Sequence, residues 1–209
     1  INALDKDNGP VGNWTTIKGC WFGTAPGKVM FSDNKEGIVP DPAQCGNGTW
    51  SNERIVREVP KLDSPTNDPS NDAVTGPVSV IRNDGEQTTF AAGFQVNTDQ
   101  LDPGLCKVAP NTGQRDEPAT LTGRGYTTKG PNDNVMFTAF GSSTDMPVTF
   151  YPTPPGWTDK EIGIRVPSDA VIAPNEVRVD KGPQSSNSLP YVVTAASACA
   201  TSCQFGNDA

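Results

Sequence analysis

Apolar and polar residues alternate with a period of two in short segments along most of the chain. The alternation is found at residues 28–31, 55–59, 78–80, 162–166 and 177–179. A period of two predicts β-strands that turn one face to a core and the other to solvent. Clusters of Gly, Pro, Asn and Asp separate these segments, and residues 83–85 (Asn-Asp-Gly) predict the turn of a hairpin. The pattern therefore predicts an all-β protein.

The second half of the chain repeats the first in the order of its residue types. Residues 16–23 (TIKGCWFG) match residues 120–127 (TLTGRGYT) at an offset of 104. Three further segments have counterparts at similar offsets: 28–31 with 134–137, 50–60 with 157–167, and 76–96 with 175–193. Self-similarity of this length indicates two homologous units. Each unit holds enough short strands for one β-sandwich.

The repeated motifs resemble those of IPT/TIG domains, which are immunoglobulin-like β-sandwiches. In the first unit the matching residues are Gly19, Phe22, Gly23, Val29, Phe31, Trp50, Ser51, Asn52, Ile55, Val59, Pro60, Gly76, Val78 and Val80. The second unit departs from the pattern at Thr127 and at Asn175-Glu176. The resemblance implies two tandem sandwiches of the IPT/TIG type. It implies little about function, because the family serves as spacers, as interaction modules and as parts of transcription factors.

We expect four segments along the chain. They are a first sandwich at residues 1–97, a linker at 98–109, a second sandwich at 110–194 and a tail at 195–209. A linker of this length allows a bent or a straight tandem rod. Cys106 lies ten residues after Val96, and Cys203 lies ten residues after Val193. The tail therefore resembles a junction to a further domain or subunit, or has a role of its own.

Composition narrows the range of functions. The 209 residues carry a formal net charge of −8 and include no histidine. The lack of histidine excludes Ser-His and Cys-His nucleophiles and histidine-ligated metals. The acidic balance argues against binding to nucleic acid. No apolar run is long enough to span a membrane. We therefore expect no catalytic residues, no enzymatic activity, no nucleic-acid partner and no membrane span.

The five cysteines indicate an oxidising compartment, and so an extracellular or cell-surface location. Cys20 and Cys45 both lie in the first unit without counterparts in the second, and we expect a disulfide between them. The alternative is two unpaired thiols. For Cys106, Cys199 and Cys203 the pairing stays open: a small ring between the last two, a bond from Cys106 to either, or a bond between subunits.

Four tryptophans are candidates for ligand contact. Trp50 and Trp157 open equivalent strands, and their recurrence favours a packing role over a sugar-stacking platform. Trp14 and Trp21 occur in the first unit alone, which makes an exposed binding surface more plausible there.

Oxygen-rich loops and sequons are weaker signals. Asp and Asn side chains gather at residues 5–8, 63–72 and 132–134, and such loops can bind calcium, although none has EF-hand spacing. Solvated acidic loops are the simpler interpretation, so no cofactor is expected beyond this calcium option. Asn13 and Asn47 begin N-glycosylation sequons.

The sequence favours a non-catalytic extracellular structural protein: a stalk, an adhesin segment or a subunit of a pilus-like filament. We expect self-association from head to tail, or contact with neighbouring domains of one protein. Strands that could be donated to a neighbouring sheet are Ile1 to Leu4 and the tail region with Val192, Val193 and Ala195. The alternatives are a module that binds a glycan or a protein, and spacer domains of a larger secreted protein.

Overall fold

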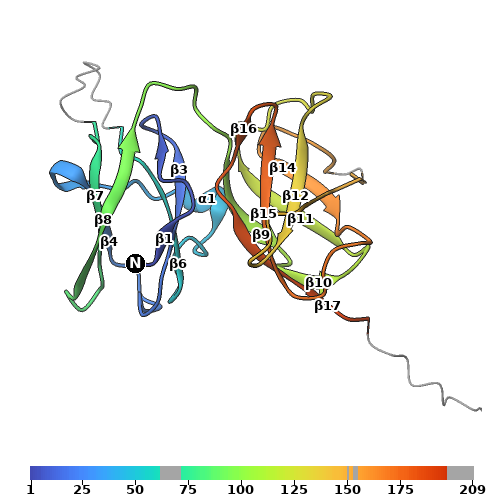
Figure 1. Cartoon of the computed structure of the whole chain (residues 1–209), viewed down its shortest axis with the longest axis horizontal. Coiled ribbons are helices and arrows are strands. Elements are labelled where there is room, and N and C mark those ends of the chain that lie inside the picture. The colour runs from blue at the N-terminus through green and yellow to red at the C-terminus, as the bar shows by residue number, and fades with distance from the viewer. Residues whose placement is uncertain (62–71, 150, 153–154, 197–209) are drawn as a thin grey trace, which may run out of the picture.

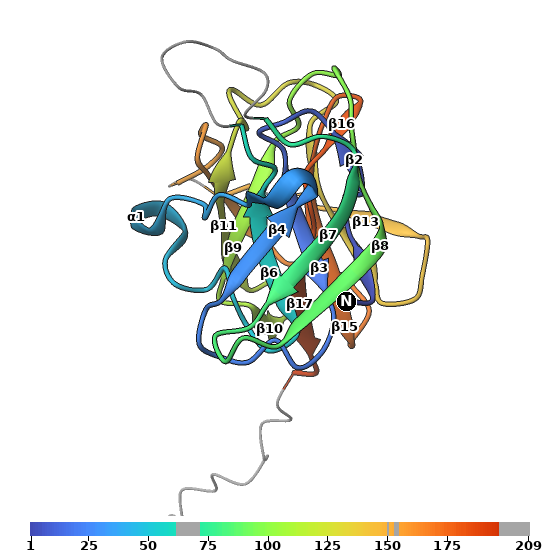
Figure 2. The same ribbon diagram turned by 90° about the vertical axis from the view of Figure 1, so that its left-hand side faces the viewer.

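The N-terminal half of the chain forms two facing β-sheets, which we call the N-terminal sandwich (Figure 1). The computed structural model describes residues 1–61, 72–149, 151–152 and 155–196. One sheet has the order β1 (Ala3–Leu4), β3 (Trp14–Lys18), β6 (Arg54–Glu58). The other has the order β2 (Asn8–Gly9), β8 (Gln87–Val96), β7 (Gly76–Ile81), β4 (Lys28–Phe31), β5 (Lys35–Glu36). Its strands β8, β7 and β4 face the viewer in Figure 2. A 3₁₀ turn, η1 (Ser32–Asn34), and a short helix, α1 (Pro42–Cys45), lie in the connections.

The C-terminal half forms a second pair of sheets, the C-terminal sandwich. Its smaller sheet has the order β14 (Glu161–Arg165), β11 (Pro118–Arg124), β9 (Gly104–Ala109). Its larger sheet has the order β10 (Thr112–Gln114), β17 (Leu189–Thr194), β15 (Pro174–Lys181), β12 (Asn134–Ala139), β13 (Asp145–Pro147), and β16 (Gln184–Ser185) also pairs with β15. The prediction of an all-β sandwich fold is confirmed.

The alternation of apolar residues produces the two cores. Val29, Phe31, Val78 and Val80 are buried in the N-terminal core, and Val135, Phe137, Val177 and Val179 are buried in the C-terminal core. The predicted hairpin at residues 83–85 is also confirmed, because β7 and β8 pair up to Ile81 and Gln87. Gly85 occupies that turn with φ of 91°, a conformation that suits glycine.

The two halves repeat each other in detail as well as in outline. The Trp50 indole donates to the carbonyl of Gly23, and the Trp157 indole donates to the carbonyl of Tyr126. Both tryptophans bridge to the isoleucine five residues later. Trp50 is buried and Trp157 packs against the C-terminal core, which confirms the packing role predicted for the pair.

The sheet β1-β3-β6 is covered on both faces, which the period-two pattern did not predict. Ile17 and Ile55 point into the N-terminal core, whereas Val56 belongs to the C-terminal core. Figure 1 shows this sheet between β4, β7 and β8 on one side and the C-terminal sandwich on the other. Thr15 and Thr16 are fully buried as well. The two sandwiches therefore lie side by side, and their contact surface, which we call the seam, has this sheet on its N-terminal side.

The predicted linker at residues 98–109 is wrong in its second half. Gly104–Ala109 form β9, which pairs with β11 inside the C-terminal sandwich. The first half is fixed at several points, because Asp102 bonds to Asn13 and the Gln184 amide donates to the carbonyls of Gln100 and Leu101. The connection is thus an ordered part of the seam and not a free hinge.

The strands expected to serve in assembly have partners within the chain. β1 pairs with β3, and Leu4 is buried in the N-terminal core. Val192 and Val193 lie in β17, which pairs with β15 on one side and with β10 on the other. Neither segment is free for donation in this chain, because β17 has a partner on each side and β1, at the edge of its sheet, pairs with β3 on one side. Ala195 follows the end of β17 and is exposed.

Candidate functional site

A disulfide joins the two sandwiches across the seam. Cys45, at the end of α1, is bonded to Cys106 in β9, with a Cα–Cα distance of 5.5 Å. Helix α1 is fixed locally, because the Asp41 side chain accepts from the Ala43 amide and Pro42 occupies the first turn. The predicted bond between Cys20 and Cys45 is wrong, since Cys20 lies exposed on another loop and forms no disulfide among the described residues. Residue spacing could not reveal a bond between the sandwiches.

Trp14 lies buried beside this disulfide and not on an exposed binding surface. Only 4% of Trp14 is exposed, and it clusters with Cys45 and Cys106. The Arg124 guanidinium lies 4.5 Å from the centre of the indole ring, and the indole nitrogen donates to Glu58 at 2.9 Å. Arg124 also pairs with Glu58 at 2.8 Å. Burial lowers the pKa of Arg124, while the Glu58 carboxylate acts against that shift. The prediction of Trp14 as a binding aromatic is therefore wrong.

The seam also contains a fully buried polar residue, Asn187. Its amide nitrogen donates to Thr16 Oγ1 at 2.9 Å and to the carbonyl of Leu105 at 2.7 Å. Its side-chain oxygen accepts from the Leu105 amide at 2.9 Å. Thr16 in turn donates to the carbonyl of Ser188 at 3.0 Å. This network ties β3 of the N-terminal sandwich to β9 and to the residues before β17.

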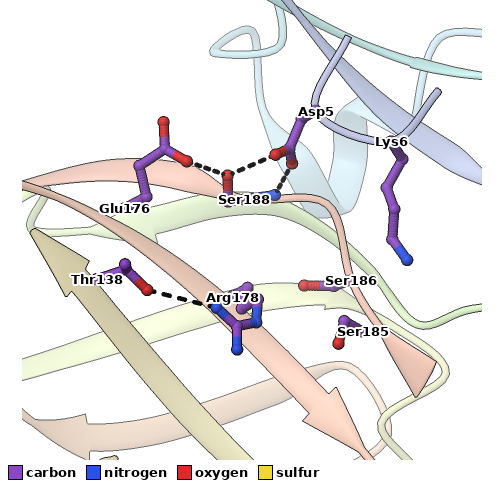
Figure 3. Close-up of a pocket in the computed structure, with 8 residues that line it drawn as sticks. All are labelled: Asp5, Lys6, Thr138, Glu176, Arg178, Ser185, Ser186 and Ser188. Carbon is purple, nitrogen blue, oxygen red and sulfur yellow. Dashed lines mark hydrogen bonds between the residues drawn. The ribbon is translucent and has the colours of Figure 1, made fainter. Parts of the chain in front are cut away.

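The cavity in Figure 3 lies at the edge of the seam. It has a volume of about 270 Å³, and its polar lining comes from both sandwiches: Asp5, Lys6, Thr138, Glu176, Arg178, Ser185, Ser186 and Ser188. The Asp5 carboxylate accepts from the Ser188 amide, and the Ser188 hydroxyl, with one proton to donate, lies 3.0 Å from the Asp5 carboxylate and 2.8 Å from that of Glu176. Lys18 bonds to Glu176, and Lys6 pairs with Asp102 at 3.1 Å. Because these polar groups form hydrogen bonds and ion pairs with one another, the cavity is better explained as part of the contact between the two sandwiches than as a ligand site.

Arg178 is committed to neighbours within its own sandwich. It pairs with Asp145 at 2.6 Å and with Asp180 at 2.9 Å. The hydrogen bonds from Arg178 lower the pKa of Asp145, and those from both aspartates raise the pKa of Arg178. The guanidinium is therefore already bound to carboxylates where it borders the cavity.

The two sequons differ in accessibility. Asn13 is fully buried, and its amide donates to Asp102 at 2.9 Å, so the prediction of Asn13 as a glycosylation acceptor is wrong. Asn47 lies exposed in a turn after α1 and stays a predicted acceptor.

The acidic loops give no support to calcium within the described residues. Asp5 is engaged with Ser188, and Asp133 accepts from the Lys181 ammonium and from the amides of Gly130 and Gly182. In residues 1–61, 72–149, 151–152 and 155–196, no group of three or more potential ligands is arranged to hold a metal ion. The acidic loop at residues 63–71 and the cysteines Cys199 and Cys203 lie outside the described residues, and their predicted roles stay predictions.

Trp21 lies in the loop that follows β3, whereas Trp14 begins that strand, and Trp21 is 77% exposed. The loop that carries it is fixed: the Phe22 amide donates to the Asn52 carbonyl, the Gly23 amide donates to the Asn52 side chain, and Phe22 is buried. Trp21 has a left-handed backbone with φ of 66°. At the equivalent position the C-terminal sandwich has Gly125, with φ of 73°.

Replacing Trp21 by glycine is expected to give a more stable protein than replacing it by alanine. A left-handed conformation costs a large L-residue about 1 kcal/mol or more, and glycine adopts it without that cost. We therefore expect Trp21→Gly to raise the free energy of unfolding by about 1 kcal/mol relative to Trp21→Ala, measured by urea denaturation. Trp21→Ala is the matched control, since it removes the same indole and keeps the strained backbone. Equal stability of the two variants would contradict the strain.

Three shallow concavities adjoin one another beside Trp21. Their volumes are about 200, 200 and 370 Å³, and Arg82 borders all three. Trp21 and Glu86 line the first, Asn83 lines the second and third, and Lys28 lines the third. We call this surface the Trp21 groove.

In the part of the chain that the structure describes, no helix is long and apolar enough to cross a membrane.

Comparison with known proteins finds only distant likeness. No family model and no curated protein matches the chain. Among solved structures, a protein crystallised with a xylogluco-oligosaccharide is 14% identical with a TM-score of 0.33, over 92% of this chain and 40% of that one. The BSP domain of a biofilm-associated protein is 12% identical with a TM-score of 0.36, over 93% and 30%. A Bacteroides ovatus protein from a mixed-linkage glucan utilization locus, in complex with a heptasaccharide, is 13% identical with a TM-score of 0.29, over 89% and 43%.

The chain thus spans less than half of each of these three proteins. TM-scores of this size carry no argument about function, so the function of this chain has to be inferred from its own residues.

Proposed function

We propose that this chain is a non-catalytic structural module of a secreted or cell-surface protein, in which two IPT/TIG-type sandwiches form one rigid body. The observation that carries the proposal is the disulfide between Cys45 and Cys106, which bonds one sandwich directly to the other. Such a module holds the neighbouring domains of its protein at a fixed spacing and angle, as a stalk or an adhesin segment requires.

The polar contacts of the seam support rigidity over a flexible tandem rod. Asn187, Arg124 and Lys18 each bond to residues of the opposite sandwich. Partly buried ionic pairs fix one geometry, because displacing either partner leaves a desolvated charge without compensation. A hinge at residues 98–103 would have to break the bonds of Asp102 and Gln184 as well.

The disulfide and the lack of histidine support a secreted or cell-surface location and a non-catalytic role. Disulfides persist in oxidising compartments, which favours a secreted or surface protein. No histidine is present to act as a base or a metal ligand. Contact with neighbouring domains of the same protein stays part of the proposal, whereas strand donation by residues 1–4 or 192–194 does not.

Small-angle X-ray scattering of the oxidised chain tests the rigid body. We expect a single-peaked distance distribution that fits two sandwiches side by side, with no change between low and high salt. The matched control is the same protein after reduction, in which the disulfide is open and the polar contacts of the seam remain. An elongated two-peaked distribution for the oxidised chain would contradict the proposal.

A further inference from the structure

The Trp21 loop and its repeat in the C-terminal sandwich perform different tasks. In the C-terminal loop Arg124 faces the seam, where its guanidinium contacts Trp14 and Glu58. In the N-terminal loop Cys20 and Trp21, the equivalents of Arg124 and Gly125, are both exposed. Trp21 thus bears backbone strain that Gly125 avoids, and its indole gains little from packing. Strain kept without a packing benefit points to a role in contact with another molecule.

Polar side chains without a hydrogen-bond partner line the groove. Glu86 and Gln87 line the concavity that holds Trp21, and Asn83 lines the other two. Within the described part of the chain, the side chains of these three residues form no hydrogen bond. The charged groups beside them are otherwise paired: Arg82 with Asp84 at 2.5 Å and Lys28 with Glu36 at 3.0 Å. The Trp21 groove therefore offers one carboxylate and two amides that solvent or a ligand must satisfy.

The shape of the groove suits an extended ligand. The three concavities run from Trp21 past Arg82 to Lys28, and each is open to solvent. None of the other large hydrophobic side chains exposed in the described residues lines them. A peptide that binds through several large apolar anchors would find one exposed indole here and, beside it, only smaller or more buried apolar surface such as Ile1 and Ile81. A polyanion would meet the unpaired carboxylate of Glu86.

We propose that the Trp21 groove binds a neutral oligosaccharide. One sugar ring stacks its C–H face on the exposed indole, which provides a large, rigid contact at low cost in conformational entropy. Hydroxyl groups of this and the following rings donate to the Glu86 carboxylate, and they donate to and accept from the side-chain amides of Gln87 and Asn83. The guanidinium of Arg82, which pairs with Asp84, borders the middle of the groove, where the oligosaccharide would pass from one end of the groove to the other.

The first test is a printed array of neutral and acidic oligosaccharides, probed with the oxidised chain. We expect binding to at least one neutral oligosaccharide, followed by titration of that compound with tryptophan fluorescence as the readout. Trp21→Ala and Glu86→Ala are each expected to weaken the affinity about tenfold or more, and Trp21→Phe is expected to retain part of it. The folding of each variant is checked by its urea midpoint.

Phe140→Ala is the matched control, because Phe140 is 78% exposed on the other sandwich and lies outside the groove. Its affinity should equal that of the unaltered chain. Absence of binding to every neutral oligosaccharide, or equal affinity of Trp21→Ala, would overturn the proposal. Binding of acidic sugars alone, or of a peptide library in place of sugars, would overturn the ligand class. None of these results bears on the rigid body proposed above, which scattering tests separately.

Discussion

Removing the disulfide between Cys45 and Cys106 is expected to be among the most destabilising changes in this protein. The bond closes a loop whose ends are 61 residues apart in sequence. A loop of that length restricts the unfolded chain by about 4 kcal/mol in the chain-entropy treatment. We therefore expect the double variant Cys45→Ala/Cys106→Ala to lose most of that amount, measured by urea denaturation without reductant.

Two controls separate the loss of the disulfide from other effects of replacing cysteine by alanine. Cys20→Ala removes an exposed thiol with no disulfide partner among the described residues, and should leave the urea midpoint unchanged. The unaltered chain in reductant should fall to the stability of the double variant. If the double variant were as stable as the oxidised chain, the bond would have no constraining role. Peptide mapping without reduction should recover Cys45 and Cys106 in one linked fragment.

The second large effect is expected from Asn187→Ala. This change deprives both backbone groups of Leu105 of a buried hydrogen-bond partner, whereas the Thr16 hydroxyl keeps its bond to the carbonyl of Ser188. Each buried group left unsatisfied costs about 1–3 kcal/mol, so we expect the two Leu105 groups to bring a total loss of about 2 kcal/mol or more. The measurement is again the free energy of unfolding from urea denaturation.

Asn83→Ala is the matched control, because that asparagine is exposed and its side chain has no partner in the described residues. Its effect on stability should lie within about 0.5 kcal/mol. Hydrogen exchange adds a second readout: the Leu105 amide, which donates to Asn187 in the unaltered chain, should lose protection in Asn187→Ala. A loss similar to that of Asn83→Ala would show that the seam does not depend on this residue.

The rigid body and the proposed ligand site lie at different places in the molecule. The seam joins the two sandwiches through Asn187, Arg124 and the disulfide, whereas the residues that line the Trp21 groove all belong to the N-terminal sandwich. A rigid module that presents a ligand site on one of its sandwiches fits a role in surface attachment. The urea and scattering experiments address the module, and the array addresses the site.

The local pattern of residue types was enough to predict many of the strands and the internal repeat, although not β9. Val29 with Phe31 and Val78 with Val80 are buried as their alternation predicts, because side-chain direction in a strand depends only on the local period. The hairpin at residues 83–85 follows from turn chemistry in the same local way. The packing role of Trp50 and Trp157 was predictable because the repeat places them at equivalent positions.

The surfaces that meet between the two sandwiches could not be predicted from the strands alone. Trp14 and Val56 belong to strands that a period of two makes half-buried, and both are buried because a second sandwich covers the outer face of their sheet. The partner of Cys45 lies in the other repeat, so spacing within one repeat selected Cys20 wrongly. Local periodicity describes one strand and its own core, whereas a contact between two sandwiches depends on complementary surfaces far apart in sequence.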